Sequence, residues 1–285
     1  MNSETAFPVL LLAGSDPDRR ELMKVYDPGR NLPSKALLPM AGKRVLDWQL
    51  EAMAGSKYIG QIYLIGLSQK EFPSAFDLSF IPFKPNSSIL EKIQFGAGVI
   101  KQDHPAIEHI IVFSGDAPGM STSSIDLFFG SFRQNQDADL LIGVVPEDVT
   151  LDFFPDHKRV IGKFKEISVY PGEIYVFRRK IIPLIEDEIR QLTIQRRQFD
   201  RQKDTSKLIP VLRYLAKKTQ LWPLIIKYSL GKLSITELES ILSRVYRIKM
   251  KAIIVPDPGF GMDLDLPEDF EKLTNYIKLT KMPAS

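Results

Sequence analysis

The sequence predicts an α/β domain in which a mostly parallel sheet is covered by helices on both faces. Short, branched apolar runs alternate with amphipathic segments in the first half, as in strands joined by crossover helices. The length of 285 residues suffices for one large domain that carries an insertion. No repeat of constant period occurs, so we expect neither a solenoid nor a propeller.

The first half contains four apolar runs that we expect to be strands. The segments between them have apolar residues at spacings of three and four, which is typical of helices that cover a sheet. The expected strands are residues 8–14, 61–67, 109–115 and 139–145, and the expected helices are residues 44–54, 87–101 and 123–135.

The apolar pattern of the second half differs from that of the first. Shorter strands are expected at residues 159–168 and 173–179, and we expect them to add antiparallel edges to the sheet. A helical insertion is then expected over residues 179–248 within a single domain of residues 1–285. A last strand at residues 249–256 should rejoin the main sheet, followed by a closing helix. The expected helices of this half are residues 181–203, 208–218, 235–247 and 267–279.

Composition excludes several classes of protein. The chain has no cysteine and three scattered histidines, so any metal is expected to bind to oxygen ligands. The longest apolar runs reach only about half of the roughly 20 residues that span a membrane, and the N-terminus does not have the pattern of a signal peptide. We therefore expect a cytoplasmic protein without a membrane partner.

Net charge gives little support for a nucleic-acid partner. The formal charge is only +3, and we interpret the basic stretch at residues 196–203 as a solvated helix face. Contact of this stretch with a nucleic acid or a membrane is the alternative. The inserted helices have two open interpretations, a lid over a site or a contact in a homodimer.

The first candidate site is the loop that follows the first expected strand. It contains Gly14, Arg19, Arg20 and Lys35. Exposed backbone amides and cations of this kind suit a triphosphate. The alternative is a solvated surface loop. Neither a Walker motif nor a dinucleotide-binding glycine motif occurs.

Two acidic segments form the second candidate site. Asp116 ends a buried strand, at the sheet edge where α/β proteins bind ligands, and a carboxylate there suits Mg²⁺. A turn or a helix cap is the alternative for this aspartate. Asp263 and Asp265 alternate in an extended stretch, so we expect only one of them to face the same metal. Asp265 with Glu268 also matches a helix capping box, which makes Asp263 the better candidate ligand.

Taken together, these segments resemble the nucleotidyltransferases of the GT-A-like fold, and specifically the MobA-like NTP transferase family. The resemblance rests on LLAGS, SKALLPMAGKRVL, GDAP and DLDLPED, in that order. It covers roughly residues 8 to 150 and 249 to 280. It implies a three-layer α/β/α, Rossmann-like fold with an inserted helical subdomain.

The resemblance also implies roles for particular residues. The loop after the first strand would bind the β- and γ-phosphates through Arg19 or Arg20, and Lys35 would neutralise the triphosphate. Asp116 with Asp263 or Asp265 would bind Mg²⁺ or Mn²⁺. The remaining nucleotide-binding residues would be Leu12, Ala13, Gly14, Ser15, Asn86, Ser87, Ser88 and Gly115, and the acceptor-binding residues would be Gly172, Glu173 and Tyr175. A plain helix cap by Ser87 or Ser88 is the alternative for that turn.

The implied partners are a nucleoside triphosphate and a small phosphorylated or polar acceptor. The sequence departs from the family's glycine-rich loop, because Asp16, Pro17 and Asp18 stand in it and the carboxylates would repel phosphate. Two alternatives therefore stay open. One is a nucleotide- or metabolite-binding protein that has lost turnover, and the other is a sugar-transferring GT-A enzyme.

Overall fold

One mixed β-sheet organises the computed structural model of the chain, which describes residues 6–14, 21–83, 87–157, 159, 161–184 and 216–282. Its strand order is β10-β7-β9-β6-β1-β4-β5, and β8 pairs with β9. The strands are β1 (Phe7–Leu12), β4 (Ile59–Ile65), β5 (Leu78–Ile81), β6 (His109–Ser114), β7 (Leu140–Pro146), β8 (Gly162–Lys163), β9 (Ser168–Arg178) and β10 (Met250–Ile254), with a separate hairpin of β2 (Pro39–Met40) and β3 (Lys43–Arg44).

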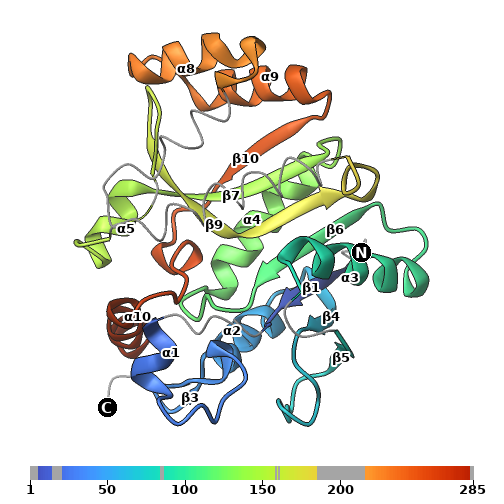
Figure 1. Cartoon of the computed structure of the whole chain (residues 1–285), viewed down its shortest axis with the longest axis vertical. Coiled ribbons are helices and arrows are strands. Elements are labelled where there is room, and N and C mark those ends of the chain that lie inside the picture. The colour runs from blue at the N-terminus through green and yellow to red at the C-terminus, as the bar shows by residue number, and fades with distance from the viewer. Residues whose placement is uncertain are drawn as a thin grey trace.

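Helices cover both faces of this sheet, as the alternation of segments predicted (Figure 1). The helix α3 packs against β1, β4 and β6 on one face, while α2 and α4 share the core of the other face. The α-helices are α1 (Glu21–Tyr26), α2 (Val45–Ala54), α3 (Ile89–Asp103), α4 (Thr122–Gln134), α5 (Glu147–Phe153), α8 (Trp222–Ser229), α9 (Ile235–Tyr246) and α10 (Pro267–Thr280).

Strand alternation divides the core into two clusters. Leu10 lies with the apolar residues of α3, such as Ile93 and Ile100. Its neighbour Leu11 lies in the other cluster, which includes Phe128 of α4. Val9, Leu10 and Leu11 of β1 are fully buried, because β1 has parallel neighbours on both sides, β4 and β6. Strands buried on both faces read as continuous apolar runs, which explains why the sequence identifies them clearly.

The expected antiparallel edges are confirmed only in part: the short strand β8, within residues 159–168, pairs antiparallel with β9 as an outer strand. The strand β9 is antiparallel to both of its neighbours, but it lies between β6 and β7 inside the sheet. It is followed outward by β7 and then by β10, which pairs with β7 in parallel and confirms that the last strand rejoins the sheet. The apolar pattern of a strand does not specify its pairing partners, so the sequence does not distinguish an interior antiparallel strand from an edge strand.

The described part of the expected insertion contains α8 and α9, which lie side by side at one end of the molecule (Figure 1). The helix α9 confirms the prediction for residues 235–247, and its Ser234 cap bonds to Glu237 in a capping box. The predictions for residues 181–203 and 208–218 fall mostly outside the described residues. The sequence reading missed α1, α5 and α8.

The C-terminal helix begins differently from the prediction. Its N-cap is Leu266, and the carboxylate of Asp269 accepts the backbone N–H groups of Asp265 at 3.2 Å and Leu266 at 2.8 Å. The expected capping box of Asp265 with Glu268 is therefore wrong. Because Asp269 caps the helix, Asp265 is available for another role.

A close approach of two glycines joins the segment before α10 to the loop after β6. A Cβ atom on Gly259, in the turn Pro258–Phe260, would collide with the backbone oxygen of Gly119. Gly259→Ala should therefore lower the free energy of unfolding by about 1–3 kcal/mol, as overpacking does. Urea denaturation measures this loss.

The matched control is Gly130→Ala in α4, where a Cβ atom meets nothing within 4 Å. This variant should gain about 0.5–1 kcal/mol, because alanine favours a helix over glycine. Equal effects of the two substitutions would contradict the proposed backbone contact.

Candidate functional site

The loop after β6 presents Asp116 at the carboxyl end of the parallel strands. Gly115 donates its N–H to the Leu12 carbonyl at 2.8 Å, and a Cβ there would meet that carbonyl oxygen at 2.5 Å. The Asp116 carboxylate accepts a short hydrogen bond from the Ser114 hydroxyl. Gln49 of α2 donates to the Ser114 carbonyl at 2.6 Å, so the base of the loop is held from a second element.

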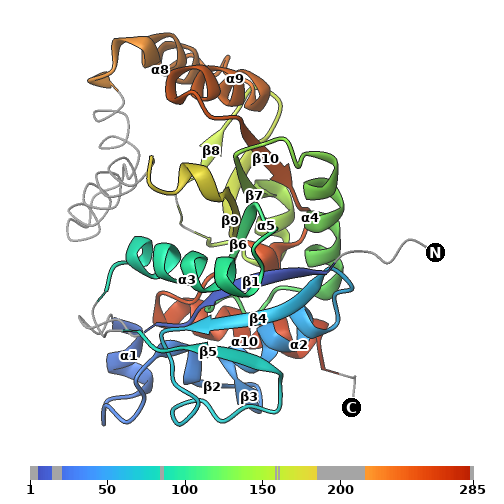
Figure 2. The same cartoon turned by 90° about the vertical axis from the view of Figure 1, so that its right-hand side faces the viewer.

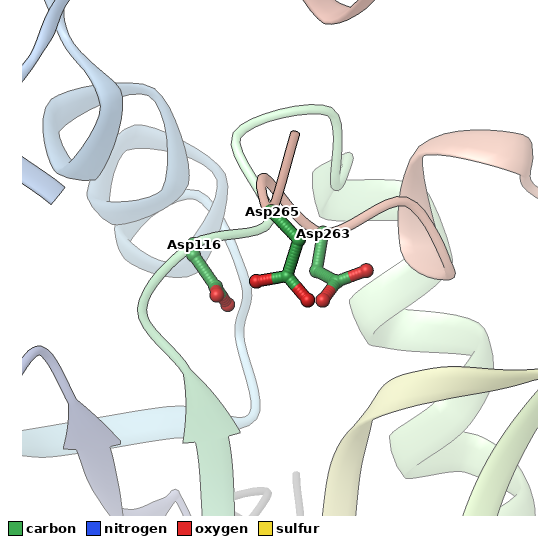
Figure 3. Close-up of side chains that lie close together, drawn as sticks. All are labelled: Asp116, Asp263 and Asp265. Carbon is green, nitrogen blue, oxygen red and sulfur yellow. The ribbon is translucent and has the colours of Figure 1, made fainter. Parts of the chain in front are cut away.

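Asp263 and Asp265 join Asp116 in one acidic cluster, from the segment between Gly261 and α10 (Figure 3). One carboxylate oxygen of each of the three residues lies within 4.8 Å of the others. The N–H of Leu264 donates to the Asp116 carbonyl at 2.9 Å, which joins the two segments directly.

The sequence expectation that only one of these two aspartates faces Asp116 is wrong. The expectation assumed regular strand alternation. The segment is not a strand in the structure, and its backbone therefore lets both carboxylates turn to the same side.

Lys35 bridges the two acidic segments. Its Nζ atom lies 2.6 Å from the Asp116 carboxylate and 2.7 Å from that of Asp265, and it donates to the Leu264 carbonyl at 2.7 Å. Burial by itself would lower the pKa of Lys35, but the charges of the neighbouring aspartates raise it above its usual value. The ammonium is therefore fixed in its charged form.

Arg159 is a second cation at the cluster. Its guanidinium pairs closely with Asp263, reaches Asp265 at 3.6 Å and binds Asp269 at 2.9 Å. It also donates to the Asp263 carbonyl at 2.8 Å. Burial opposes its charge, and the three carboxylates raise its pKa overall. The same guanidinium thus joins the acidic cluster to the first turn of α10.

A fourth carboxyl group, Glu173 of β9, lies near the cluster and is partly buried. Burial, followed by the charges of Asp263 and Asp116, raises the pKa of Glu173 well above its ordinary value. Burial and like charges also raise the pKa of Asp263 to about 6, although Arg159 opposes this shift. The site therefore holds more carboxyl groups than its cations neutralise.

A second group of residues surrounds Gly14. The Nζ atom of Lys92 lies so close to Gly14 that a Cβ there would collide with it. The Ser34 hydroxyl donates to the Gly14 carbonyl at 3.2 Å. Gly66, with φ +107°, packs its backbone against Gly14 from the next strand. A buried lysine thus stands beside the strand end at which a triphosphate was expected.

The structure locates most of the predicted site residues. Lys35, Asp116, Asp263 and Asp265 come together, and Leu12, Ala13, Gly14 and Gly115 form the adjoining strand ends. Ser88 caps α3 in a capping box with Glu91, which matches the alternative interpretation of that turn. The residues Ser15, Arg19, Arg20 and Asn86 lie outside the described residues.

The expected acceptor loop is instead part of strand β9. Gly172 is buried there against Phe260, and Tyr175 pairs in register with Val112 and Ile142. Glu173 is the member of this trio that lies near the acidic cluster.

Three residues of the site were missed by the sequence reading. Arg159 precedes a short strand in no recognisable motif, and Asp269 was assigned no role. Lys92 had a usable signal, because it is a lysine on the buried face of α3, whose other buried residues include Leu90 and Ile93.

The residues present fit a hard divalent cation. Three carboxylates from two segments offer oxygen ligands, which Mg²⁺ prefers. Lys35 already places a positive charge between two of them at hydrogen-bonding distance. The cluster is thus built for positive charge, and a cation would take the place of the ammonium.

The fold matches solved structures of nucleotidyltransferases. A hypothetical transferase from Thermus thermophilus is 21% identical, with a TM-score of 0.67 over 93% of this chain and 100% of its own. A CMP:2-keto-3-deoxy-manno-octonic acid synthetase complexed with CTP is 13% identical and has a TM-score of 0.54. The match covers 96% of this chain and 99% of the synthetase. The 4-diphosphocytidyl-2C-methyl-D-erythritol synthase from Anaerococcus prevotii is 11% identical and has a TM-score of 0.52. This match covers 96% of this chain and 99% of the synthase.

These likenesses define the class of fold, a GT-A-like nucleotidyltransferase fold with a mostly parallel mixed sheet. No protein-family model matches the chain, and the comparison with curated proteins finds no match. Among the described residues, no helix is long and apolar enough to cross a membrane.

Removing the guanidinium of Arg159 should destabilise the protein. Arg159→Met leaves Asp263 and Asp269 without their cation, and we expect a loss of about 2–4 kcal/mol at pH 7, slightly below the range for fully buried pairs. The loss should shrink towards pH 5. Without Arg159 the pKa of Asp263 rises further above 6, so the folded state takes up a proton as the pH falls.

Chemical denaturation at pH 7 and pH 5 measures this effect. The control is Lys227→Met, which breaks an ion pair with Glu237 whose side chains are 46% and 40% exposed. That variant should lose little stability, because solvent screens an exposed ion pair. A pH-independent loss in the Arg159 variant would contradict the electrostatic explanation.

Proposed function

We propose that this protein is a metal-dependent nucleotidyltransferase, which transfers a nucleoside monophosphate from a nucleoside triphosphate to a small phosphorylated or polar acceptor. The observation that carries the proposal is the meeting of Asp116, Asp263 and Asp265 beside the ends of β1 and β6. The fold adds support, because one structure that shares it is described as complexed with CTP.

Within this class we keep the finer MobA-like assignment as part of the proposal. It rests on the sequence elements LLAGS, SKALLPMAGKRVL and DLDLPED. These elements contribute Gly14, Lys35, Asp263 and Asp265, and the contacts of Lys35 with the late aspartate segment support the proposal.

The metal would be held by Asp116 together with Asp263 or Asp265, and Mg²⁺ or Mn²⁺ suits these oxygen ligands. When bound, it neutralises charge on the phosphates during transfer. Lys92 beside Gly14 and Lys35 in the acidic cluster would bind phosphate oxygens. Arg19 and Arg20 remain predicted phosphate ligands, and Ser15 and Asn86 remain predicted nucleotide contacts.

An oxygen of the acceptor would attack the α-phosphorus in line. A new P–O bond forms to the acceptor, the bond to the bridging oxygen of the β-phosphate breaks, and pyrophosphate leaves with the electron pair. The main contribution of the protein is to position the phosphates and to stabilise their charge. A phosphate acceptor already carries its negative charge and needs no base. Glu173, Gly172 and Tyr175 remain the predicted acceptor side of the site.

The described geometry also indicates how the resting site is balanced. Without a nucleotide, the Lys35 ammonium is held between the carboxylates of Asp116 and Asp265. Binding of a triphosphate would give this ammonium a new partner and would free the carboxylates for the metal. Nucleotide and metal are therefore expected to bind together more tightly than either alone.

Asp116→Asn should abolish metal-dependent release of pyrophosphate, because it removes one negative ligand while it keeps the shape of the side chain. Stability should change by no more than about 1–2 kcal/mol. The assay offers each of the four triphosphates with Mg²⁺ and a panel of sugar phosphates, and it measures pyrophosphate.

The matched control is Asp152→Asn on α5, an exposed carboxylate remote from the cluster in sequence. It should leave activity unchanged. Full turnover in the Asp116 variant would refute the assignment. Nucleotide binding without turnover in the wild-type protein would favour the alternative of a binding protein that has lost catalysis.

Lys35→Met should raise the affinity of the nucleotide-free protein for Mn²⁺ by about tenfold or more, since a competing cation is removed from the carboxylates. The same substitution should weaken triphosphate binding. Electron paramagnetic resonance counts free Mn²⁺ directly. Lys24→Met, an exposed residue of α1, is the control, and unchanged Mn²⁺ affinity in the Lys35 variant would contradict the exchange of cations.

A further inference from the structure

A second, basic groove lies on the sheet face covered by α3. It has a volume of about 810 Å³ and is bounded by the later turns of α3 and by the end of β9 with the residues that follow. Figure 2 shows α3 lying along this face. The volume falls within the range of about 300–1,000 Å³ that is usual for small-molecule sites.

The groove is separate from the acidic cluster. Its residue Arg178 ends β9, whereas Glu173, near the acidic cluster, lies five positions earlier on the same strand. At about 3.4 Å per residue this separation is roughly 17 Å. On the neighbouring strand, Glu108 precedes β6 and Asp116 follows it. The groove and the cluster therefore lie at opposite ends of these strands.

The wall of the groove carries an excess of positive charge. Lys101, Arg178, Arg179 and Lys180 line it, against the single carboxylate of Glu108. Asp139 behind the wall pairs with two of these cations, Arg178 at 3.4 Å and Lys180 at 2.9 Å. The other two, Lys101 and Arg179, form no ion pair among the described residues.

Of these two residues, Arg179 gives the stronger indication of a ligand. Its Nη1 atom is buried, yet it has no hydrogen-bond partner within the described part of the chain. A buried donor without a partner is costly, by about 1–3 kcal/mol and more for a charged group. The residue as a whole is only partly buried, so the side chain can turn into the groove, where its guanidinium would bind two oxygens of one phosphate in a bidentate manner.

The floor between the cations is apolar and open. It is made by Ala97 and Gly98 on α3 and by Ile182 and Pro183 after β9. A Cβ on Gly98 would meet nothing within 4 Å, so the helix leaves free space there. An apolar floor with cations at its rim favours a ligand that has both an anionic group and a carbon body.

We propose that this groove is a second ligand site, which binds a small phosphorylated organic molecule with its phosphate on Arg179 and Lys101. The inference uses none of the residues of the proposed nucleotidyltransferase site and does not depend on that function. The phosphate supplies the missing partner of Arg179, and the floor along α3 receives the organic part.

The test uses the full chain and follows backbone amide signals by NMR while inorganic pyrophosphate, and then glucose 6-phosphate, is added. The amides of Gly98 and Lys180 should shift and saturate, independently of any shift at Gly14 and Gly115. Arg179→Gln should weaken the binding measured at Gly98 by about tenfold, as expected for loss of a charged hydrogen bond.

Lys101→Gln, at an exposed position of α3, provides a second variant, and it should weaken the same binding. Lys232→Gln, an exposed lysine outside the groove, should leave the binding constant unchanged. Shifts confined to Gly14 and Gly115 would overturn the proposal while leaving the nucleotidyltransferase site intact. Equal binding constants in wild type and both groove variants would overturn it as well.

Discussion

The candidate site depends on the repulsion among three carboxylates that the fold forces together. The hydrogen bond from Leu264 to the Asp116 carbonyl fixes two distant segments side by side, and their acids then lie within 4.8 Å of one another. Such a cluster is stable only when positive charge is held in it. Lys35 supplies that charge at Asp116, and Arg159 supplies it at Asp263. The same requirement makes the site receptive to a divalent cation and to the phosphates that accompany it.

The sheet explains how residues so far apart in sequence come to this point. The parallel strands β1 and β6 end beside each other, which brings the Gly14 loop and the Asp116 loop to one edge. The strand β9 runs antiparallel between β6 and β7. Its early part therefore lies at the carboxyl ends of its neighbours, and its last residues lie at their amino ends. One strand therefore contributes Glu173 to the acidic site and Arg178 to the basic groove. The two sites share a rigid element but no residues.

Sequence predicted the parts of the structure that depend on local pattern. The buried strands β1, β4, β6 and β7 and the helices α2, α3, α4 and α10 appear close to their expected bounds, because continuous apolar runs and helical spacing are strong signals. Long-range order was not predictable in the same way. The interior place of β9 depends on pairing with two strands, and the convergence of Asp263 and Asp265 depends on irregular backbone. The contacts of Arg159 follow from tertiary structure alone.

The most direct test of the central claim is a crystal structure with Mn²⁺ and a triphosphate analogue that resists cleavage at the α-phosphorus. The account predicts an anomalous peak about 2.0–2.2 Å from an oxygen of Asp116 and from Asp263 or Asp265. It also predicts that the Lys35 ammonium has moved from these carboxylates to the phosphates. A bound triphosphate with Lys35 still paired to Asp116 and Asp265, and with the manganese elsewhere, would contradict it.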